Sequence, residues 1–111
     1  MSTDAATLAR TWIDMWNAGT PDALPLADDF THTSPFRRVQ GRETYLEWVK
    51  PLAAKNVTDL RIHRTLAQGN MATIHFEMDT PGGVVQVCDW VEVADGRITA
   101  IHSFYDATGL R

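Results

Sequence analysis

The chain has 111 residues, of which 44% are hydrophobic and 22% charged, a composition typical of one soluble globular domain over residues 1–111. The formal net charge is −4 and no dense run of Lys and Arg occurs, which argues against nucleic acid as a partner. No apolar stretch approaches the ~20 residues of a membrane span, no signal-peptide pattern is present, and the single cysteine, Cys88, cannot form an internal disulfide. We therefore expect a cytoplasmic protein that contacts no membrane.

The first half of the chain predicts helices with one short strand between them. Apolar residues at helical spacing indicate a long first helix, with Thr3 as its N-cap and Gly19 at its C-terminal stop. In the second long helix, Pro51 falls near the end and is expected to kink or close it. The predicted elements are a helix over Thr3–Ala18, a short helix over Thr20–Leu24, a strand over Asp29–Ser34 and a helix over Gly41–Ala54.

From Val57 onward the pattern is that of β-strands separated by short turns. Connections this short join consecutive strands into an antiparallel meander, and Asp95–Gly96 is the strongest hairpin signal of the chain. Helices followed by a sheet define an α+β domain. The expected strands are Thr58–Ala67, Met71–Thr80, Val84–Val93 and Ile98–Tyr105.

One carboxylate, Asp89, lies in the middle of the apolar strand Val84–Val93. A charge in a buried strand is costly unless it is paired or protonated. Asp89 therefore has either a structural role, as an acceptor for Trp12, Trp16 or a backbone amide, or a role in a functional site. The residues themselves leave both interpretations open.

Several stretches together resemble a SnoaL-like domain, and they span nearly the whole chain. They are Trp16–Leu24, Ala27–Pro35, Gly41–Glu43, and the late hairpin Asp95–Ile98 with the ending Phe104–Asp106. This family belongs to a superfamily resembling nuclear transport factor 2, with ketosteroid isomerase, limonene epoxide hydrolase, scytalone dehydratase and polyketide cyclases as members. The resemblance implies a cone-shaped, curved antiparallel β-sheet wrapped around N-terminal helices, with an internal apolar pocket and a convex face that forms a homodimer.

The resemblance also assigns positions, one by one. The general base of ketosteroid isomerase immediately precedes the proline that ends the first strand, and here that residue is Ser34. Its oxyanion hole uses a tyrosine, which falls on Trp12, and a protonated aspartate, which falls on Asp89. Because a serine hydroxyl is too weak a base to remove a proton from carbon, the chain is not a standard ketosteroid isomerase. The carboxylates of limonene epoxide hydrolase fall on Glu77 and Ser103, which does not support that mechanism either.

Strand alternation adds further candidates on the same face as these positions. His32 lies two residues before Ser34 and shares its face. Asp89 and His32 are the expected catalytic pair: neutral Asp89 donates a hydrogen bond to a carbonyl or enolate oxygen, and His32, with an ordinary pKa, moves the proton. The alternative for His32 is a histidine that is satisfied in the pocket or core and moves no proton. The residues expected to line the pocket and bind a small apolar ligand are Trp12, Trp16, Ser34, Trp48, Ser103 and Tyr105.

These residues predict a small cofactor-independent enzyme of isomerase, cyclase or dehydratase type that acts on an apolar carbonyl compound. The alternative is a non-catalytic small-molecule-binding or dimerisation module of the same fold. No spacing of His, Cys, Asp and Glu indicates a metal site. The four tryptophans are expected mostly in the core, and Cys88 as a buried small hydrophobe that points away from the pocket. His75 and Glu77 are expected on the face opposite Ile74, and His102 and Phe104 outward.

Overall fold

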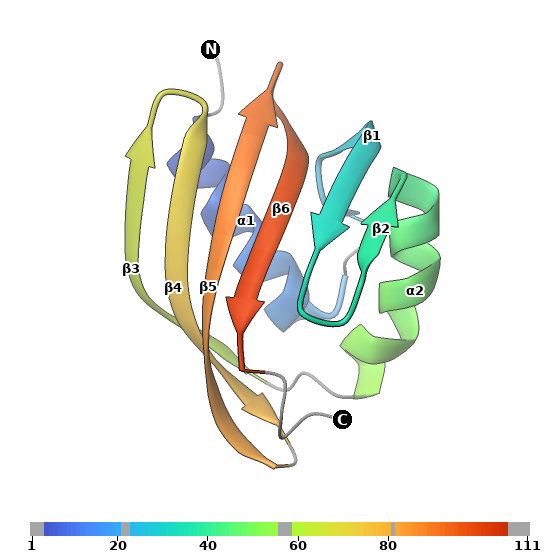
Figure 1. Ribbon diagram of the computed structural model, residues 1–111, viewed down its shortest axis with the longest axis vertical. Coiled ribbons are helices and arrows are strands. Elements are labelled where there is room, and N and C mark those ends of the chain that lie inside the picture. Colours follow the sequence, from blue (N-terminus) through green and yellow to red (C-terminus); the bar gives the residue numbers. More distant parts are fainter. Residues whose placement is uncertain (1–3, 21–22, 56–58, 81, 107–111) are drawn as a thin grey trace.

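The computed structural model describes residues 4–20, 23–55, 59–80 and 82–106. Within these ranges the chain forms two helices and six strands, and the strands make one sheet in the order β2-β1-β6-β5-β4-β3. The elements are α1 (Ala5–Ala18), β1 (Leu26–Thr33), β2 (Arg38–Gln40), α2 (Arg42–Lys55), β3 (Leu60–Gln68), β4 (Met71–Thr80), β5 (Gly83–Ala94) and β6 (Arg97–Tyr105) (Figure 1).

The sheet is curved and mixed, and the α+β class is confirmed. Strands β3 to β6 form the predicted antiparallel meander, and their bounds lie within two residues of the expected ones. Strand β1 pairs parallel with β6, with Thr31 opposite Ala100, and antiparallel with the three-residue strand β2, which the sequence pattern did not predict. The expectation of a purely antiparallel sheet is therefore corrected at the β1–β6 pair.

Helix α1 covers one face of the sheet and packs against β3, β4 and β5. It begins where the Asp4 side chain accepts a hydrogen bond from the Thr7 backbone N–H at 2.8 Å, which makes Asp4 the N-cap; Thr3, the predicted cap, lies outside the described residues. It ends at Gly19, as predicted, with a left-handed φ of 72°. The Asn17 side chain then binds the backbone N–H and C=O of Leu60, at 2.7 and 2.9 Å, which fixes the end of α1 to β3.

Helix α2 packs against β1 and β2, beside the part of the sheet that α1 leaves free (Figure 1). Its buried positions include Tyr45, Leu46 and Val49, at helical spacing. Pro51 lies inside α2 and does not close it, because the helix continues to Lys55. The short helix predicted over Thr20–Leu24 falls partly on residues 21–22, outside the described residues.

The hairpin between β5 and β6 sets the register of the strands that carry the candidate site. Asp95 and Gly96 both have positive φ angles, 53° and 75°, as a type I′ turn requires. The resulting ladder places Asp89 directly opposite Ser103 on β6 and opposite Ile74 on β4. All three side chains are buried on the face that α1 covers. The tight turn and the bulge beside it at Glu92/Val93 together fix which polar groups meet in the core.

Candidate functional site

The Asp89 carboxyl lies in the core, with its residue only 2% exposed. Oδ2 accepts a hydrogen bond from the Trp12 indole Nε1 at 3.0 Å, while Oδ1 has no hydrogen-bond partner. Burial raises the pKa of Asp89 to about 7, against the smaller opposing effects of the Ser103 hydroxyl and the Trp12 N–H. Burial thus brings the pKa of the carboxyl group close to neutral pH, far from its ordinary value.

The neighbouring imidazole belongs to His32, which is buried on β1. The His32 Nε2 lies 3.0 Å from the Ser103 Oγ. Since Ser103 is also directly opposite Asp89 in the β5–β6 ladder, Ser103 lies between His32 and Asp89. Burial, followed by the nearby charge of His102, lowers the pKa of His32 to about 4. His32 is thus neutral at pH 7 and a weak base, which corrects the expectation of an ordinary pKa.

Tyr45 is the central residue of the cluster, and the sequence interpretation did not select it. Its side chain is fully buried on α2, with its ring centroid 5.2 Å from that of His32 and 5.8 Å from that of Trp12. The hydroxyl has no partner in good hydrogen-bond geometry. Burial, with a smaller contribution from Asp89, raises the pKa of Tyr45 well above its ordinary value, against the opposing effect of the nearby Trp16 N–H. The sequence signal that could have indicated Tyr45 was a hydroxyl-bearing side chain on the apolar side of the second long helix.

The remaining predicted residues lie at the edge of this cluster. Trp16 and Trp48 are half-buried, with ring centroids 6.2 Å from Trp12 and 6.1 Å from His32 respectively. Tyr105 is half-buried at the end of β6. Ser34 belongs to a turn, where its Oγ donates to the Arg37 carbonyl at 3.4 Å and accepts from the Phe36 N–H at 3.3 Å. The structure therefore brings Trp12, His32, Asp89 and Ser103 together and places the others around them.

Three polar atoms of this cluster have unused hydrogen-bonding capacity. Four buried side-chain polar atoms in the described ranges lack a partner, and three of them are Asp89 Oδ1, His32 Nδ1 and Tyr45 Oη. Leaving one such group unsatisfied costs about 1–3 kcal/mol, so native cores rarely keep several together without a reason. This concentration of unpaired atoms among aromatic rings defines the candidate site.

Two residues on the outer face of the sheet are more exposed than expected. Cys88 does point away from the cluster, but it is exposed, with its Sγ 3.1 Å from the Thr73 Oγ1. Trp90 is 40% exposed and is not part of the core. Both residues lie on the face that no described helix covers. Alternation predicted the direction of Cys88 but not its exposure. As expected, His75 and Glu77 also lie on this face. There His75 is hydrogen-bonded to Gln86, and Glu77 accepts a hydrogen bond from Arg61.

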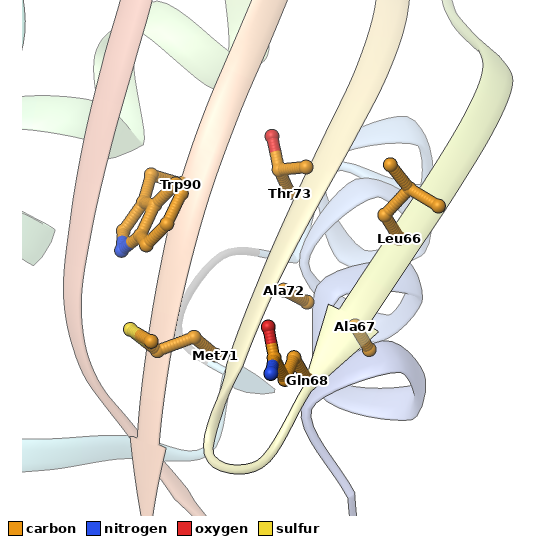
Figure 2. Close-up of a pocket in the computed structure, with 7 residues that line it drawn as sticks. All are labelled: Leu66, Ala67, Gln68, Met71, Ala72, Thr73 and Trp90. Atoms are coloured by element: carbon orange, nitrogen blue, oxygen red, sulfur yellow. The ribbon is translucent and has the colours of Figure 1, made fainter.

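A shallow hollow of about 310 Å³ opens on this outer face, between strands β3, β4 and β5. Figure 2 shows the side chains that line it, which are Leu66, Ala67, Gln68, Met71, Ala72, Thr73 and Trp90. The hollow is separated by the sheet from the buried cluster around Asp89. The internal apolar pocket that the resemblance implies thus stays a prediction.

The described residues form neither a metal site nor a membrane-spanning helix. None of their His, Cys, Asp and Glu side chains form a group of three or more that could hold a metal ion. None of the helices in the same ranges is long and apolar enough to cross a membrane.

A curved mixed sheet with two helices on one face defines the class of proteins that resemble nuclear transport factor 2. The model of the SnoaL-like domain family matches residues 9–101. The chain therefore belongs to the SnoaL-like family, whose relatives include isomerases and cyclases. No curated protein matches the sequence.

Solved structures share the fold over most of the chain. A protein from Kribbella flavida, provisionally assigned as a ketosteroid isomerase, is 25% identical, with a TM-score of 0.76 and coverage of 91% of this chain and 76% of its own. A provisionally assigned polyketide cyclase from Sinorhizobium meliloti is 22% identical, with a TM-score of 0.77 and coverage of 87% of this chain and 93% of its own. A hypothetical protein with a ketosteroid isomerase-like fold from Catenulispora acidiphila, in complex with trimethylamine, is 17% identical, with a TM-score of 0.75 and coverage of 95% and 89%.

Proposed function

We propose that the protein is a small cofactor-independent enzyme of isomerase, cyclase or dehydratase type that acts on an apolar carbonyl compound. The observation that carries this proposal is the group of unpaired polar atoms, Asp89 Oδ1, His32 Nδ1 and Tyr45 Oη, buried among aromatic rings. A flat ligand with one carbonyl oxygen would bind the rings and use this free hydrogen-bonding capacity. The family adds relatives of isomerase and cyclase type.

Asp89 is the group best suited to move a proton in this site. General acid–base catalysis is most effective when the pKa of the catalytic group lies near the working pH, and the pKa of Asp89 is about 7 whereas that of His32 is about 4. In our proposal the ionised Oδ1 takes the proton from the carbon next to the carbonyl, and the electron pair of the broken C–H bond moves to form the enolate. Asp89 then returns the proton to the product.

Tyr45 has the complementary role in this proposal. Its pKa is raised well above the ordinary value, so its hydroxyl stays protonated and can donate a hydrogen bond. A donor that is already fixed where negative charge develops stabilises an enolate oxygen more in a dry site than in water. His32, neutral and bonded to Ser103, supplies a further polar contact.

Exchange of carbon-bound protons tests this chemistry without knowledge of the natural substrate. Wild-type protein is expected to accelerate deuterium uptake at the acidic positions of 2-tetralone in D₂O, followed by NMR. Asp89→Asn should lower the enzymatic rate by about 100-fold or more, and Tyr45→Phe by about tenfold. The matched control, Asp14→Asn, changes an exposed carboxylate on α1 and should leave the rate unchanged. Wild-type activity in the Asp89→Asn variant would overturn the assignment.

A non-catalytic binding module is the second candidate, and the aromatic cluster favours it. Aromatic faces bind alkylammonium ions through cation–π interactions, and the structural neighbour from Catenulispora acidiphila was solved with trimethylamine. An ionised Asp89 would balance such a cation. If wild-type protein fails to accelerate exchange in 2-tetralone, while trimethylammonium shifts the Trp12 indole N–H resonance, the binding module replaces the enzyme.

We also propose that the outer face of the sheet forms a homodimer. Leu66, Trp90 and Phe104 are 70%, 40% and 60% exposed on this face, and exposed apolar side chains gathered on one face are typical of interfaces. Around them lie charges of both signs, such as those of Arg61 and Glu77. Mixed charges suit a second copy of the same surface related by a two-fold axis.

Sedimentation velocity tests this assembly. The wild type is expected to sediment as a dimer, and Trp90→Glu and Phe104→Glu as monomers, because each variant would bury an unpaired charge in the interface. Glu47→Arg, an equally drastic change on the exposed side of α2, should leave the dimer intact. A monomeric wild type, or dimeric Trp90→Glu and Phe104→Glu variants, would contradict the proposed interface.

A further inference from the structure

The turn between β1 and β2 lies against the edge of the aromatic cluster. Residues 34–37 are closed by a hydrogen bond from the Ser34 backbone N–H to the Arg37 carbonyl, at 3.0 Å. From this turn the Phe36 ring contacts Tyr105, with ring centroids 6.0 Å apart. The Arg37 guanidinium lies over the Trp48 ring, 5.6 Å from its centroid. Both contacts are made with the half-buried aromatic residues that border the site.

Arg37 is connected to the unpaired polar atoms through one aromatic ring. Trp48 contacts His32 and Tyr45, with ring centroids 6.1 and 6.2 Å apart, and carries Arg37 on its face. A ligand that lies along Trp48 with one end near Tyr45 would therefore reach the guanidinium with its other end. The geometry gives the site an inner end that carries the Asp89 carboxyl and an outer end that is positive.

The guanidinium is available to a ligand in this position. Arg37 is exposed, and it makes no ion pair with any carboxylate in the described part of the chain. A cation–π contact uses only the face of the guanidinium and leaves its in-plane N–H groups free, in the fork that matches a carboxylate. In a chain of net charge −4, a cation that is stacked at the border of a site and has no ion pair among the described residues is a specific feature.

We infer that the ligand of this site is a keto acid, with a carboxylate that binds Arg37 at the outer end and a carbonyl that reaches the Asp89–Tyr45 end. This inference rests on the proposed function and refines its substrate class, from an apolar carbonyl compound to one that also carries a carboxylate at its outer end. The orientation follows from charge, because a carboxylate placed beside Asp89 would meet a second acidic group in a dry core, whereas at Arg37 it meets an opposite charge. Arg37 is thus a specificity-determining residue, outside the group of atoms that move the proton.

A matched pair of probes isolates the contribution of the carboxylate. We would measure the dissociation constants of 4-oxo-4-phenylbutanoate and of its methyl ester by tryptophan fluorescence and calorimetry. The wild type is expected to bind the acid about fivefold more tightly than the ester at low salt, with a smaller ratio at high salt. Arg37→Gln should abolish the preference, because it weakens the binding of the acid more than that of the ester.

Arg38→Gln is the control, since Arg38 is the next residue, carries the same charge and is exposed. It should retain the preference for the acid. A preference lost equally in Arg38→Gln would show a general effect of surface charge and overturn the inference. So would equal binding of acid and ester by the wild type, although the proposed function would stand if 2-tetralone still exchanged. If neither probe binds at millimolar concentration and 2-tetralone does not exchange, both the keto-acid inference and the proposed function are overturned.

Discussion

Asp89→Asn is expected to stabilise the protein at pH 8 and to have a much smaller effect at pH 4. The native pKa of Asp89, about 7, lies above the ordinary value of 3.8 because burial disfavours the charged form. The native state therefore binds this proton more tightly than the unfolded state. Asp89 contributes stability that is fully present below pH 3.8 and is lost as the pH rises through about 7.

Complete loss of this contribution corresponds to roughly 4 kcal/mol for a pKa difference of this size. The asparagine side chain does not titrate. The free energy of unfolding of Asp89→Asn, relative to that of the wild type, should therefore rise by up to that amount between pH 4 and pH 8. His32 acts in the opposite direction, since its pKa is lowered and its contribution is lost as the pH falls through about 4. Both proteins keep His32, and the difference between them isolates Asp89.

Urea denaturation at several pH values measures this difference. Asp14→Asn, an exposed carboxylate on α1, should show no comparable dependence on pH. If Asp89→Asn changes the free energy of unfolding by the same amount at pH 4 and pH 8, the carboxyl does not titrate in the core near neutral pH. In that case its proposed role in proton transfer fails as well.

The parts of the site that could be predicted from the sequence are those set by local rules. The Asp95–Gly96 turn has positive φ at both positions and starts the pairing of β5 with β6. Alternation within each strand correctly places Asp89 and Ser103 inward and Phe104 outward. The bulge at Glu92/Val93, which shifts the pairing by one residue between the turn and these positions, was not predicted. The hydrogen bond between Trp12 and Asp89 is one of the structural alternatives that the sequence left open. It is compatible with a functional role, because it occupies only one of the two carboxyl oxygens.

The parts that could not be predicted depend on contacts between distant segments. The parallel pairing of β1 with β6 joins residues far apart in the chain, and the three residues of β2 are too few for a periodic pattern. The buried hydroxyl of Tyr45 acquires significance only beside Asp89 and His32, which lie on other elements. The exposure of Cys88 and Trp90 depends on which face the helices cover. The low pKa of His32 likewise results from burial, which no residue type specifies alone.

Trp12→Phe should destabilise the protein by about 3 kcal/mol, and by more at pH 8 than at pH 4. The variant keeps an aromatic ring in the core but removes the N–H that donates to Asp89 Oδ2. That donor lowers the pKa of Asp89, so its loss raises this pKa further and costs the ionised form more than the protonated one.

Trp48→Phe provides the matched comparison on the same cluster. Trp48 is half-buried and contacts His32 and Tyr45 through its ring, so its truncation removes packing without removing a donor to Asp89. Its cost should be smaller and independent of pH. An equal loss at pH 4 and pH 8 in Trp12→Phe would mean that the indole contributes packing alone. A loss that grows with pH would show that one tryptophan keeps a buried carboxyl ionisable at neutral pH, which is the property that proton transfer by Asp89 requires.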